Sequence, residues 1–178
     1  MSTVRQSHIS HRGNVFDVEV ITQPDDRGRS VRREIVRHPG AVLVVPRLPD
    51  GRLVLIRNHR IAVDESLLEF PAGKLEPGEP PIDAAARELE EETGYRAARI
   101  EPLAEFFTSP GFSDERMHAF VADRLTEVGQ RLEAGEQIQV ETFSGAQVLA
   151  MIDNGRIHDG KTIAAMLFWH RRHGQQHP

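Results

Sequence analysis

The sequence predicts an α+β protein of about one soluble domain, and three observations lead to this description. Strand-like segments outnumber helix-like ones, and the two kinds do not alternate regularly as in a βαβ fold. The length of 178 residues is about one domain, and hydrophobic residues, at 39%, suffice for a core. A charged fraction of 28% is ordinary for a soluble protein. A disordered chain, a collagen-like chain and a disulfide-dependent mini-protein are therefore excluded.

The N-terminal segment predicts a β-hairpin. Residues 14–21 alternate apolar and polar side chains over most of their length, which is typical of a strand. A turn signal follows at 24–28, and residues 30–37 predict a returning strand. We therefore divide the chain into an N-terminal β region, residues 1–38, and a main domain, residues 39–178.

Two strands and a proline-rich loop begin the main domain. Residues 41–45 form a short apolar run that predicts a buried strand. Asp50 and Gly51 predict a hairpin turn that leads into the next strand at 53–56. Residues 71–81 contain four prolines and two glycines, so they predict a loop.

A helix is predicted at 82–92, where Ala, Glu and Leu residues run without a breaker from Pro81 to Gly94. The face expected to pack on a sheet carries Ile82, Ala85, Ala86 and Leu89. The remaining strands are predicted at 100–107, 116–122 and 138–143. The remaining helices are predicted at 144–154, with Ser144 as N-cap, and at 161–173.

Three carboxylates project from one side of the helix at 82–92, because Glu91 and Glu92 lie three and four residues after Glu88. They repel one another, and they lie near the negative end of the helix dipole. A divalent cation would reverse that balance, and hard oxygen ligands select Mg²⁺ or Mn²⁺. From the helix alone, a solvated face with Arg87 as a partner for Glu91 remains the alternative.

The loop before this helix changes the balance between the two interpretations. Residues 73–95 match the pattern G-x5-E-x7-R-E-U-x-E-E-x-G-U, where U is a bulky aliphatic residue, and only Tyr95 departs from it. This segment closely resembles the Nudix box. The resemblance implies an α/β/α sandwich around a mixed sheet, and hydrolysis of a nucleoside diphosphate linked to another moiety.

The resemblance also implies roles for single residues. Glu88 and Glu92 would be the main ligands of Mg²⁺, or of Mn²⁺ as the alternative ion, with Glu91 near them. The backbone carbonyl of Ala72 would be a further ligand. Glu79 and Arg87, the other charged positions of the pattern, would orient the loop and the helix.

Sequence outside the box is similar to the ADP-ribose pyrophosphatase subgroup. Residues 109–115 read Ser-Pro-Gly-Phe-Ser-Asp-Glu, and residues 68–73 read Leu-Glu-Phe-Pro-Ala-Gly. This similarity implies substrate contacts at Gly111 and Glu115, although a plain Pro-Gly turn remains the alternative. Arg60 looks like the family arginine that reaches the diphosphate, a task suited to a guanidinium fork.

The strand predicted at 30–37 resembles the N-terminal strand of the same subgroup. There it belongs to a small domain that exchanges across a homodimer and contacts the adenine end of the partner's substrate. The resemblance therefore implies a homodimer, with Arg32, Arg33 and Glu34 as substrate contacts. A solvated hairpin strand is the alternative.

The general base is expected on an acidic loop before the last strand. Residues 132–138 retain two acids, since Ala134 occupies a place that is often acidic in relatives. Glu136 aligns best and would be the base or a metal ligand, and Glu133 is the second candidate. The catalytic set implied by the resemblance is thus Glu92, Glu133 and Glu136.

The predicted function is Mg²⁺-dependent hydrolysis of ADP-ribose, or a related nucleoside diphosphate sugar, to AMP and ribose 5-phosphate. One alternative is another nucleotide sugar such as GDP-mannose. An alternative of another class is a Nudix domain that binds nucleotides without cleaving them, although such domains often lose box glutamates that this chain retains.

Composition predicts the surroundings of the protein. The net charge of −5 gives no basic surplus for a nucleic-acid partner. No apolar run approaches the length of a membrane span, and the N-terminus lacks a signal-peptide pattern, so no membrane partner is expected. The chain has no cysteine, which fits a reducing compartment, and we predict a cytoplasmic location.

Overall fold

The computed structural model describes residues 4–132, 135 and 137–173. The strands are β1 Gln6–Arg12, β2 Asp17–Pro24, β3 Ser30–Arg37, β4 Ala41–Pro46, β5 Leu53–Arg60, β6 Glu65–Glu69, β7 Ala72–Lys74, β8 Tyr95–Phe107, β9 Arg116–Glu127 and β10 Ile138–Phe143. The helices are α1 Pro81–Thr93, α2 Gly145–Asp153 and α3 Gly160–His173. None of the described helices is long and apolar enough to cross a lipid bilayer.

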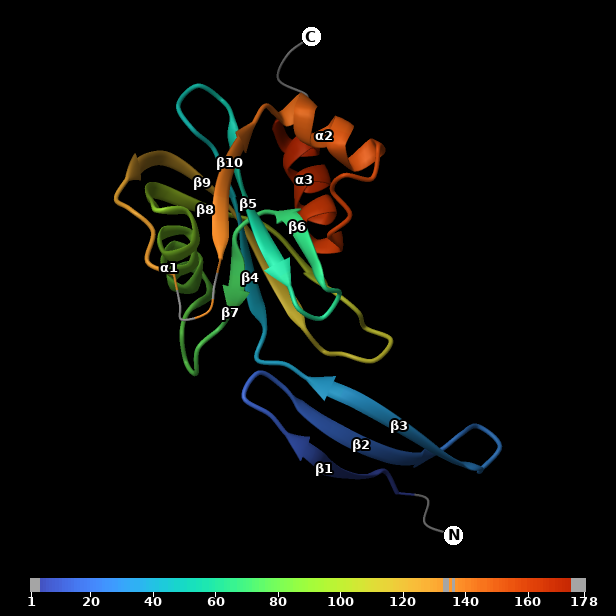
Figure 1. Ribbon diagram of the computed structural model, residues 1–178. Coiled ribbons are helices and arrows are strands. Elements are labelled where there is room, and N and C mark those ends of the chain that lie inside the picture. The colour runs from blue at the N-terminus through green and yellow to red at the C-terminus, as the bar shows by residue number, and fades with distance from the viewer. Residues whose placement is uncertain (1–3, 133–134, 136, 174–178) are drawn as a thin grey trace.

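The strands form three sheets (Figure 1). The central sheet has the order β7-β4-β9-β8, and its β4–β9 pair is parallel while the other two pairs are antiparallel. This mixed sheet confirms the α+β class and the sheet type predicted from the sequence. The second sheet, β10-β5-β6, and the N-terminal sheet, β1-β2-β3, are antiparallel throughout.

Both faces of the central sheet are covered, and β4 shows how. Successive side chains of a strand point to opposite faces, so Val42 and Val44 pack with Ala85 and Leu89 of α1. On the other face, the side chains that alternate with them in β4 join a second cluster with residues of β5, α2 and α3. The continuous apolar run at 41–45 is therefore explained by burial on both faces. Helices on either side of a mixed sheet give the predicted sandwich.

The end of α1 bears directly on the site. Gly94 has a left-handed φ of 72°, and its N–H donates to the Glu90 carbonyl at 3.0 Å, which ends the helix. The packing face differs in part from the expectation, because Ile82 is 44% exposed and Ala86 is also exposed. Ala84 is fully buried in their place, beside the expected Ala85 and Leu89. The face is rotated so that the side of α1 bearing Glu88 and Glu92 lies toward β7 rather than toward solvent.

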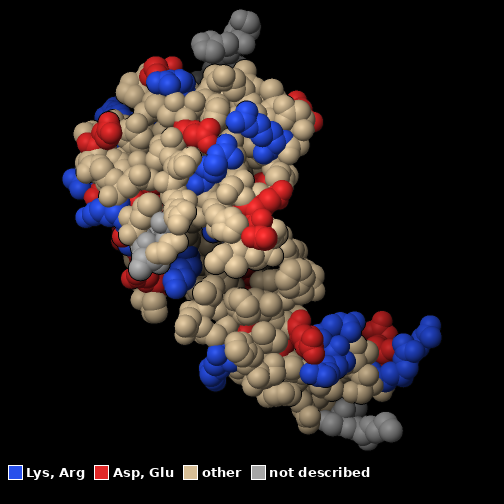
Figure 2. All heavy atoms as spheres, in the orientation of Figure 1, with Lys and Arg blue, Asp and Glu red and all other residues tan. Residues whose placement is uncertain are grey.

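The N-terminal sheet contains the predicted hairpin as β2 and β3, and β1 adds a third strand. All seven residues of β1 are exposed, so no alternation of apolar residues revealed it. The sheet lies beside the main body in Figure 1, and charges of both signs are interspersed on it in Figure 2.

A short backbone bridge joins this sheet to the segment at 109–115. The Val36 N–H donates to the Phe112 carbonyl at 2.8 Å, and the Asp114 N–H donates to the Val36 carbonyl at 3.2 Å. Arg37 pairs with Asp114 at 2.8 Å, and hydrogen bonds to Asp114 and then to Glu19 raise the pKa of Arg37. The segment that resembles the subgroup therefore anchors the N-terminal sheet.

Candidate active site

The three glutamates of α1 lie in a partly buried position beside β7. Glu92 is 4% exposed, and the side chains of Glu88 and Glu91 are 13% and 28% exposed. A simple solvated face would leave all three open to water, so this burial counts against that alternative.

Arg87 fastens the loop before α1 to the helix. Its Nε and Nη2 donate to the two oxygens of Glu79 at 2.9 and 3.0 Å. Its Nη1 donates to Glu88 at 2.7 Å and to Glu91 at 3.2 Å. The hydrogen bond from Arg87 lowers the pKa of Glu79, and the same pairing raises the pKa of Arg87. This geometry is consistent with the orienting role implied for Glu79 and Arg87.

The start of β7 packs closely against the carboxylates. The Ala72 N–H donates to Glu92 Oε2 at 2.8 Å. A Cβ added at Gly73 would lie 2.0 Å from Cδ and Oε1 of Glu88, so the carboxylate occupies the space that any larger residue would need. Glycine is therefore needed at position 73 because the Glu88 carboxylate leaves no room for a side chain, and not because of the backbone conformation.

A cavity of about 330 Å³ adjoins this contact. Its wall includes Arg60 of β5, Ala72 and Gly73 of β7, Glu115 and Lys161. The structure therefore brings together four of the predicted elements: the arginine, the carbonyl-bearing alanine, the box glycine and the acid of the 109–115 segment. Arg60 lines this cavity from β5 and Glu115 from the segment just before β9, so charged groups of both signs meet there, as a site for a charged ligand requires.

Glu115 is held at the cavity wall by neighbouring polar groups. Thr108 Oγ1 donates to Glu115 Oε2 at 2.5 Å, and His38 Nδ1 lies 3.7 Å from its other oxygen. Gly111 does not line this cavity, and its added Cβ would meet nothing within 4 Å. The substrate contact implied for Gly111 stays a prediction.

The predicted contacts of β3 lie outside the cavity of their own chain. Arg32 pairs with Glu34 at 3.1 Å, and their side chains are 64% and 65% exposed. Arg33 is also exposed, and its Nη1 donates to the Arg32 carbonyl at 3.2 Å. Within one chain these three residues therefore form part of an open surface.

The two candidate bases, Glu133 and Glu136, lie outside the described residues. The segment that precedes them is held against the end of α1. Gln130 Nε2 donates to the Glu92 carbonyl at 2.7 Å, and the Arg131 N–H donates to the Glu91 carbonyl at 3.0 Å.

Sequence reasoning missed a buried ionic cluster next to the cavity. Glu69 is 0% exposed and accepts two hydrogen bonds from Arg60, at 2.8 and 2.7 Å, and another from Lys161. Lys161 also pairs with Asp159 at 2.9 Å. The available signal was a charged residue between Leu68 and Phe70, since an acid inside an apolar strand needs a buried partner.

The donor set suits a divalent ion that prefers oxygen. Glu88 and Glu91 accept from the same Arg87 nitrogen, so their carboxylates lie side by side. Across the described ranges, no three acidic or histidine side chains converge closely enough to enclose an ion. A closed cage is not required, because Mg²⁺ commonly takes one or two carboxylates together with substrate phosphates and water. The residues present therefore fit such an ion.

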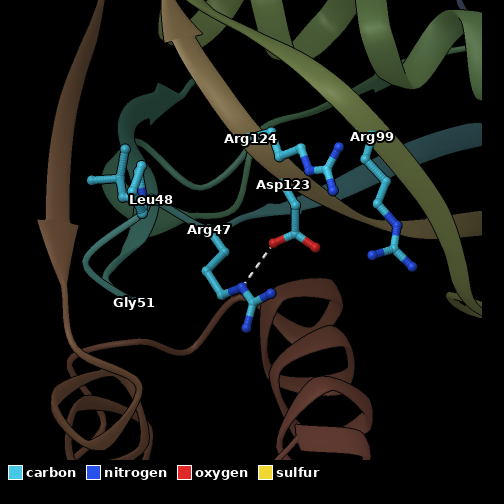
Figure 3. A pocket seen from close by; sticks show the side chains of 7 residues that line it. Arg47, Leu48, Gly51, Arg99, Asp123 and Arg124 are labelled. Carbon is cyan, nitrogen blue, oxygen red and sulfur yellow. Dashed lines mark hydrogen bonds and ion pairs between the residues drawn. The ribbon is translucent and has the colours of Figure 1, made fainter.

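A second cavity lies at the opposite end of β4 and is distinct from this site (Figure 3). Its volume is about 340 Å³, and Arg47, Arg99, Asp123 and Arg124 line it. Arg47 Nε pairs with Asp123 at 2.7 Å. Arg47 directly follows β4, so at about 3.3 Å per residue it lies roughly 20 Å from Ala41, the first residue of β4, which lines the first cavity.

Comparison with known proteins supports this description. The family model of the NUDIX domain matches residues 37–166. An ADP-ribose pyrophosphatase of Bacillus subtilis (strain 168) is 37% identical over 158 residues, covering 88% of this chain and 85% of that protein. A methanol dehydrogenase activator of Bacillus methanolicus is 38% identical over 167 residues, covering 93% and 90%. A GDP-mannose pyrophosphatase of Yersinia enterocolitica is 35% identical over 156 residues, covering 81% of each.

A solved structure agrees with the fold. A crystal structure of an ADP compounds hydrolase has a TM-score of 0.82 to this chain at 23% identity, and covers 96% of this chain and 94% of its own. The chain belongs to the Nudix family and is a Nudix pyrophosphohydrolase. Within that family it falls in the ADP-ribose pyrophosphatase-like subgroup, which confirms the assignment predicted from residues 73–95 and 109–115.

Proposed function

We propose that this protein hydrolyses the diphosphate bond of ADP-ribose to AMP and ribose 5-phosphate with Mg²⁺, or with Mn²⁺ as the alternative ion. The observation that carries the proposal is that Glu88 and Glu92 of α1 contact Gly73 and Ala72, and that these two residues line a cavity together with Arg60. A carboxylate group for cations and a guanidinium for phosphate then lie within one site, as a diphosphate substrate requires.

Glu88 and Glu92 would hold the divalent ion, with Glu91, Glu136 and the carbonyl of Ala72 as further ligands. Bound there, the ion would neutralise the phosphate oxygens and acidify water at the site. The Ala72 N–H bond at 2.8 Å supports this assignment, because it fixes the direction of the Glu92 carboxylate.

The remaining step is the attack of water on one phosphorus. Glu136 would take the proton of the attacking water, with Glu133 as the second candidate. The bond between that phosphorus and the bridging oxygen breaks, and the bridging oxygen leaves with the other phosphate. The anchoring of Gln130 and Arg131 on the last turn of α1 supports a base from this segment, since Glu133 follows Arg131 by only two residues.

We further propose that the protein works as a homodimer, in which the N-terminal region, residues 1–38, contacts the substrate of the partner. Arg32, Arg33 and Glu34 are exposed and line no cavity near α1 in their own chain, which supports a role toward a second copy. Light scattering gives the mass in solution. A monomeric mass with full activity would contradict this part of the proposal.

A substrate panel tests the function. The protein is incubated with Mg²⁺ and ADP-ribose, ADP-mannose, GDP-mannose, NADH or diadenosine polyphosphates, and the products are identified. Fastest release of AMP and ribose 5-phosphate from ADP-ribose is the expected result. Preferred cleavage of GDP-mannose would transfer the proposal to the alternative substrate. No cleavage of any compound with either Mg²⁺ or Mn²⁺ would favour nucleotide binding without catalysis.

The cytoplasmic location also remains a proposal. It is supported by the absence of cysteine, which suits a reducing compartment.

A further inference from the structure

We propose that Lys161 is a second cation for the substrate diphosphate, and that Glu69 is a positioning residue that holds both Lys161 and Arg60 at the cavity. The inference deepens the proposed function and rests on it, because it takes the ligand to be a nucleoside diphosphate compound. It concerns residues outside the Nudix box, on β6 and at the start of α3.

The cluster is layered, with its anion inside and its cations toward the cavity. Glu69 is 0% exposed, whereas the side chains of Arg60 and Lys161 are 37% and 16% exposed. Arg60 and Lys161 both line the cavity, and Glu69 does not. A negatively charged ligand therefore meets the two cations while the carboxylate behind them stays out of contact.

Both cations keep donors for a ligand. A guanidinium has five N–H groups, and Arg60 uses its Nε and one Nη2 donor on Glu69. An ammonium has three, and Lys161 uses two on Glu69 and Asp159. Because Glu69 fixes the side chains in advance, little side-chain entropy would be lost when phosphate oxygens accept the remaining donors.

The side chain of Lys161 is also held by Asp159, at the start of its own helix. Asp159 caps α3 by accepting from the Thr162 N–H at 3.0 Å, while its other oxygen pairs with Lys161. Thr162 Oγ1 in turn accepts from the Phe70 N–H at 3.0 Å, which ties the first turn of α3 to the residue after Glu69. The position of the ammonium is thus set by two elements that are distant in sequence.

Lys161 marks the junction of two cavities. A neighbouring cavity of about 470 Å³ is lined by Phe106, Phe107 and Ser109, among others, and it shares Glu115, Met117 and Lys161 with the first. A nucleoside diphosphate compound has an organic group on each side of its diphosphate. A ligand that extends through both cavities would therefore place its central diphosphate beside Lys161.

Stability alone does not account for the cluster. Removing a carboxylate from water costs several kcal/mol, and a well-packed apolar group is often at least as stabilising as a buried ion pair. The residues on either side of Glu69, Leu68 of β6 and Phe70 just after this strand, are both buried and apolar. A buried acid at that position is explained if its task is to hold two cations for a ligand.

Calorimetric titration without metal tests this inference directly. With EDTA present, ADP-ribose is not turned over, so its binding to the intact protein can be measured. Lys161→Met keeps the length of the side chain and removes its charge, and Lys161→Arg restores a cation. Glu69→Gln keeps the size of the positioning residue. Asp123→Asn is the matched control, because Asp123 pairs with Arg47 at 2.7 Å in the remote cavity of Figure 3.

We expect Lys161→Met to weaken ADP-ribose binding roughly tenfold or more, as for the loss of a charged hydrogen bond, and Lys161→Arg to recover part of it. Glu69→Gln should weaken binding and steepen its dependence on salt, and Asp123→Asn should bind as the wild type does. Thermal unfolding of each variant shows that it is folded. In assays with Mg²⁺, KM should rise more than kcat falls for Lys161→Met.

Two outcomes would overturn the inference. Equal binding by the wild type and folded Lys161→Met would remove Lys161 from the diphosphate site, while hydrolysis by the wild type would leave the proposed function intact. Absence of any metal-free binding by the wild type would also overturn it, because the two cations alone should retain the diphosphate. If the substrate panel selects GDP-mannose, the proposed substrate fails and the same series with GDP-mannose decides the inference.

Discussion

Replacing Gly73 by alanine perturbs the contact that joins the box loop to its helix. Gly73 has no left-handed φ, so the backbone itself accepts alanine. The new methyl carbon would lie 2.0 Å from two atoms of the Glu88 carboxyl group, whereas real contacts of this kind are not shorter than 3.0 Å. The carboxylate must therefore move by about 1 Å or more, and a shift of that size disturbs its hydrogen bond with Arg87.

The cost follows from what that movement breaks. Glu88 accepts from Arg87 Nη1 at 2.7 Å, and the two side chains are 13% and 25% exposed. A hydrogen bond between charged groups contributes about 1.5–3 kcal/mol when protected, so partial exposure reduces the expected loss to about 1–2 kcal/mol. The melting temperature should fall by roughly 2–8 °C for a chain of this size. Because the displaced Glu88 carboxylate is also a proposed ligand of the divalent ion, kcat should fall by about 100-fold.

Thermal unfolding and an Mg²⁺ titration of ADP-ribose hydrolysis measure both effects. A double-mutant cycle supplies the control, because Gly73→Ala should cost little further stability once Glu88→Ala has removed the clashing group. The reasoning is refuted if Gly73→Ala alone retains the wild-type Tm and kcat. It is also refuted if the alanine is as harmful without the Glu88 side chain as with it.

Three further outcomes are expected. Glu92→Gln keeps a hydrogen-bond acceptor but loses a charge, so kcat in steady-state assays should fall roughly 100-fold or more with little change in Tm. Near-normal turnover would contradict the role of Glu92 as a ligand of the divalent ion. Arg87 lowers the pKa of Glu79, so this pair stabilises the fold above the unfolded pKa of Glu79, and the stabilisation is lost as pH falls through the lowered folded pKa. When Tm is measured at decreasing pH, Glu79→Gln should therefore lose less Tm than the wild type does. A hydrogen bond with Glu65 raises the pKa of His158, so this pair stabilises the fold fully below the unfolded pKa of His158, and the stabilisation is lost as pH rises through the folded pKa. In an NMR titration, Glu65→Gln should move the pKa of His158 down toward 6.5, and an unchanged pKa would contradict the pairing.

Local patterns predicted most of the fold. The helix expected at 82–92 is α1 at Pro81–Thr93, and Ser144 caps α2 by accepting from the Gln147 N–H at 3.2 Å as expected. Three strands escaped prediction, β1, β6 and β7, and two of them, β1 and β7, lack a local signal of their own. β1 is exposed throughout and pairs with β2, the next strand along the chain. β7 has only three residues, lies within the proline-rich loop and pairs with β4, which is not its neighbour in sequence.

The site was predictable where its residues follow one another along a helix, and less so where the chain must fold to join them. The spacing of Glu88, Glu91 and Glu92 fixes their common side of α1. The cluster around Glu69 joins Arg60 of β5 to Lys161 of α3, across 92 residues of sequence for the Glu69–Lys161 pair. No periodicity links such positions, and only the packing of α3 on the sheet brings them together.

The central claim is that the carboxylates of α1 hold a divalent ion against a bound diphosphate. A crystal grown with Mn²⁺ and a non-cleavable ADP-ribose analogue tests it, because Mn²⁺ is located by its anomalous scattering. The account predicts an anomalous peak about 2.0–2.3 Å from oxygens of Glu88 and Glu92 and beside the phosphates. A bound analogue with no peak there, and with Glu88 still paired to Arg87 and Glu92 to the Ala72 N–H, would contradict it.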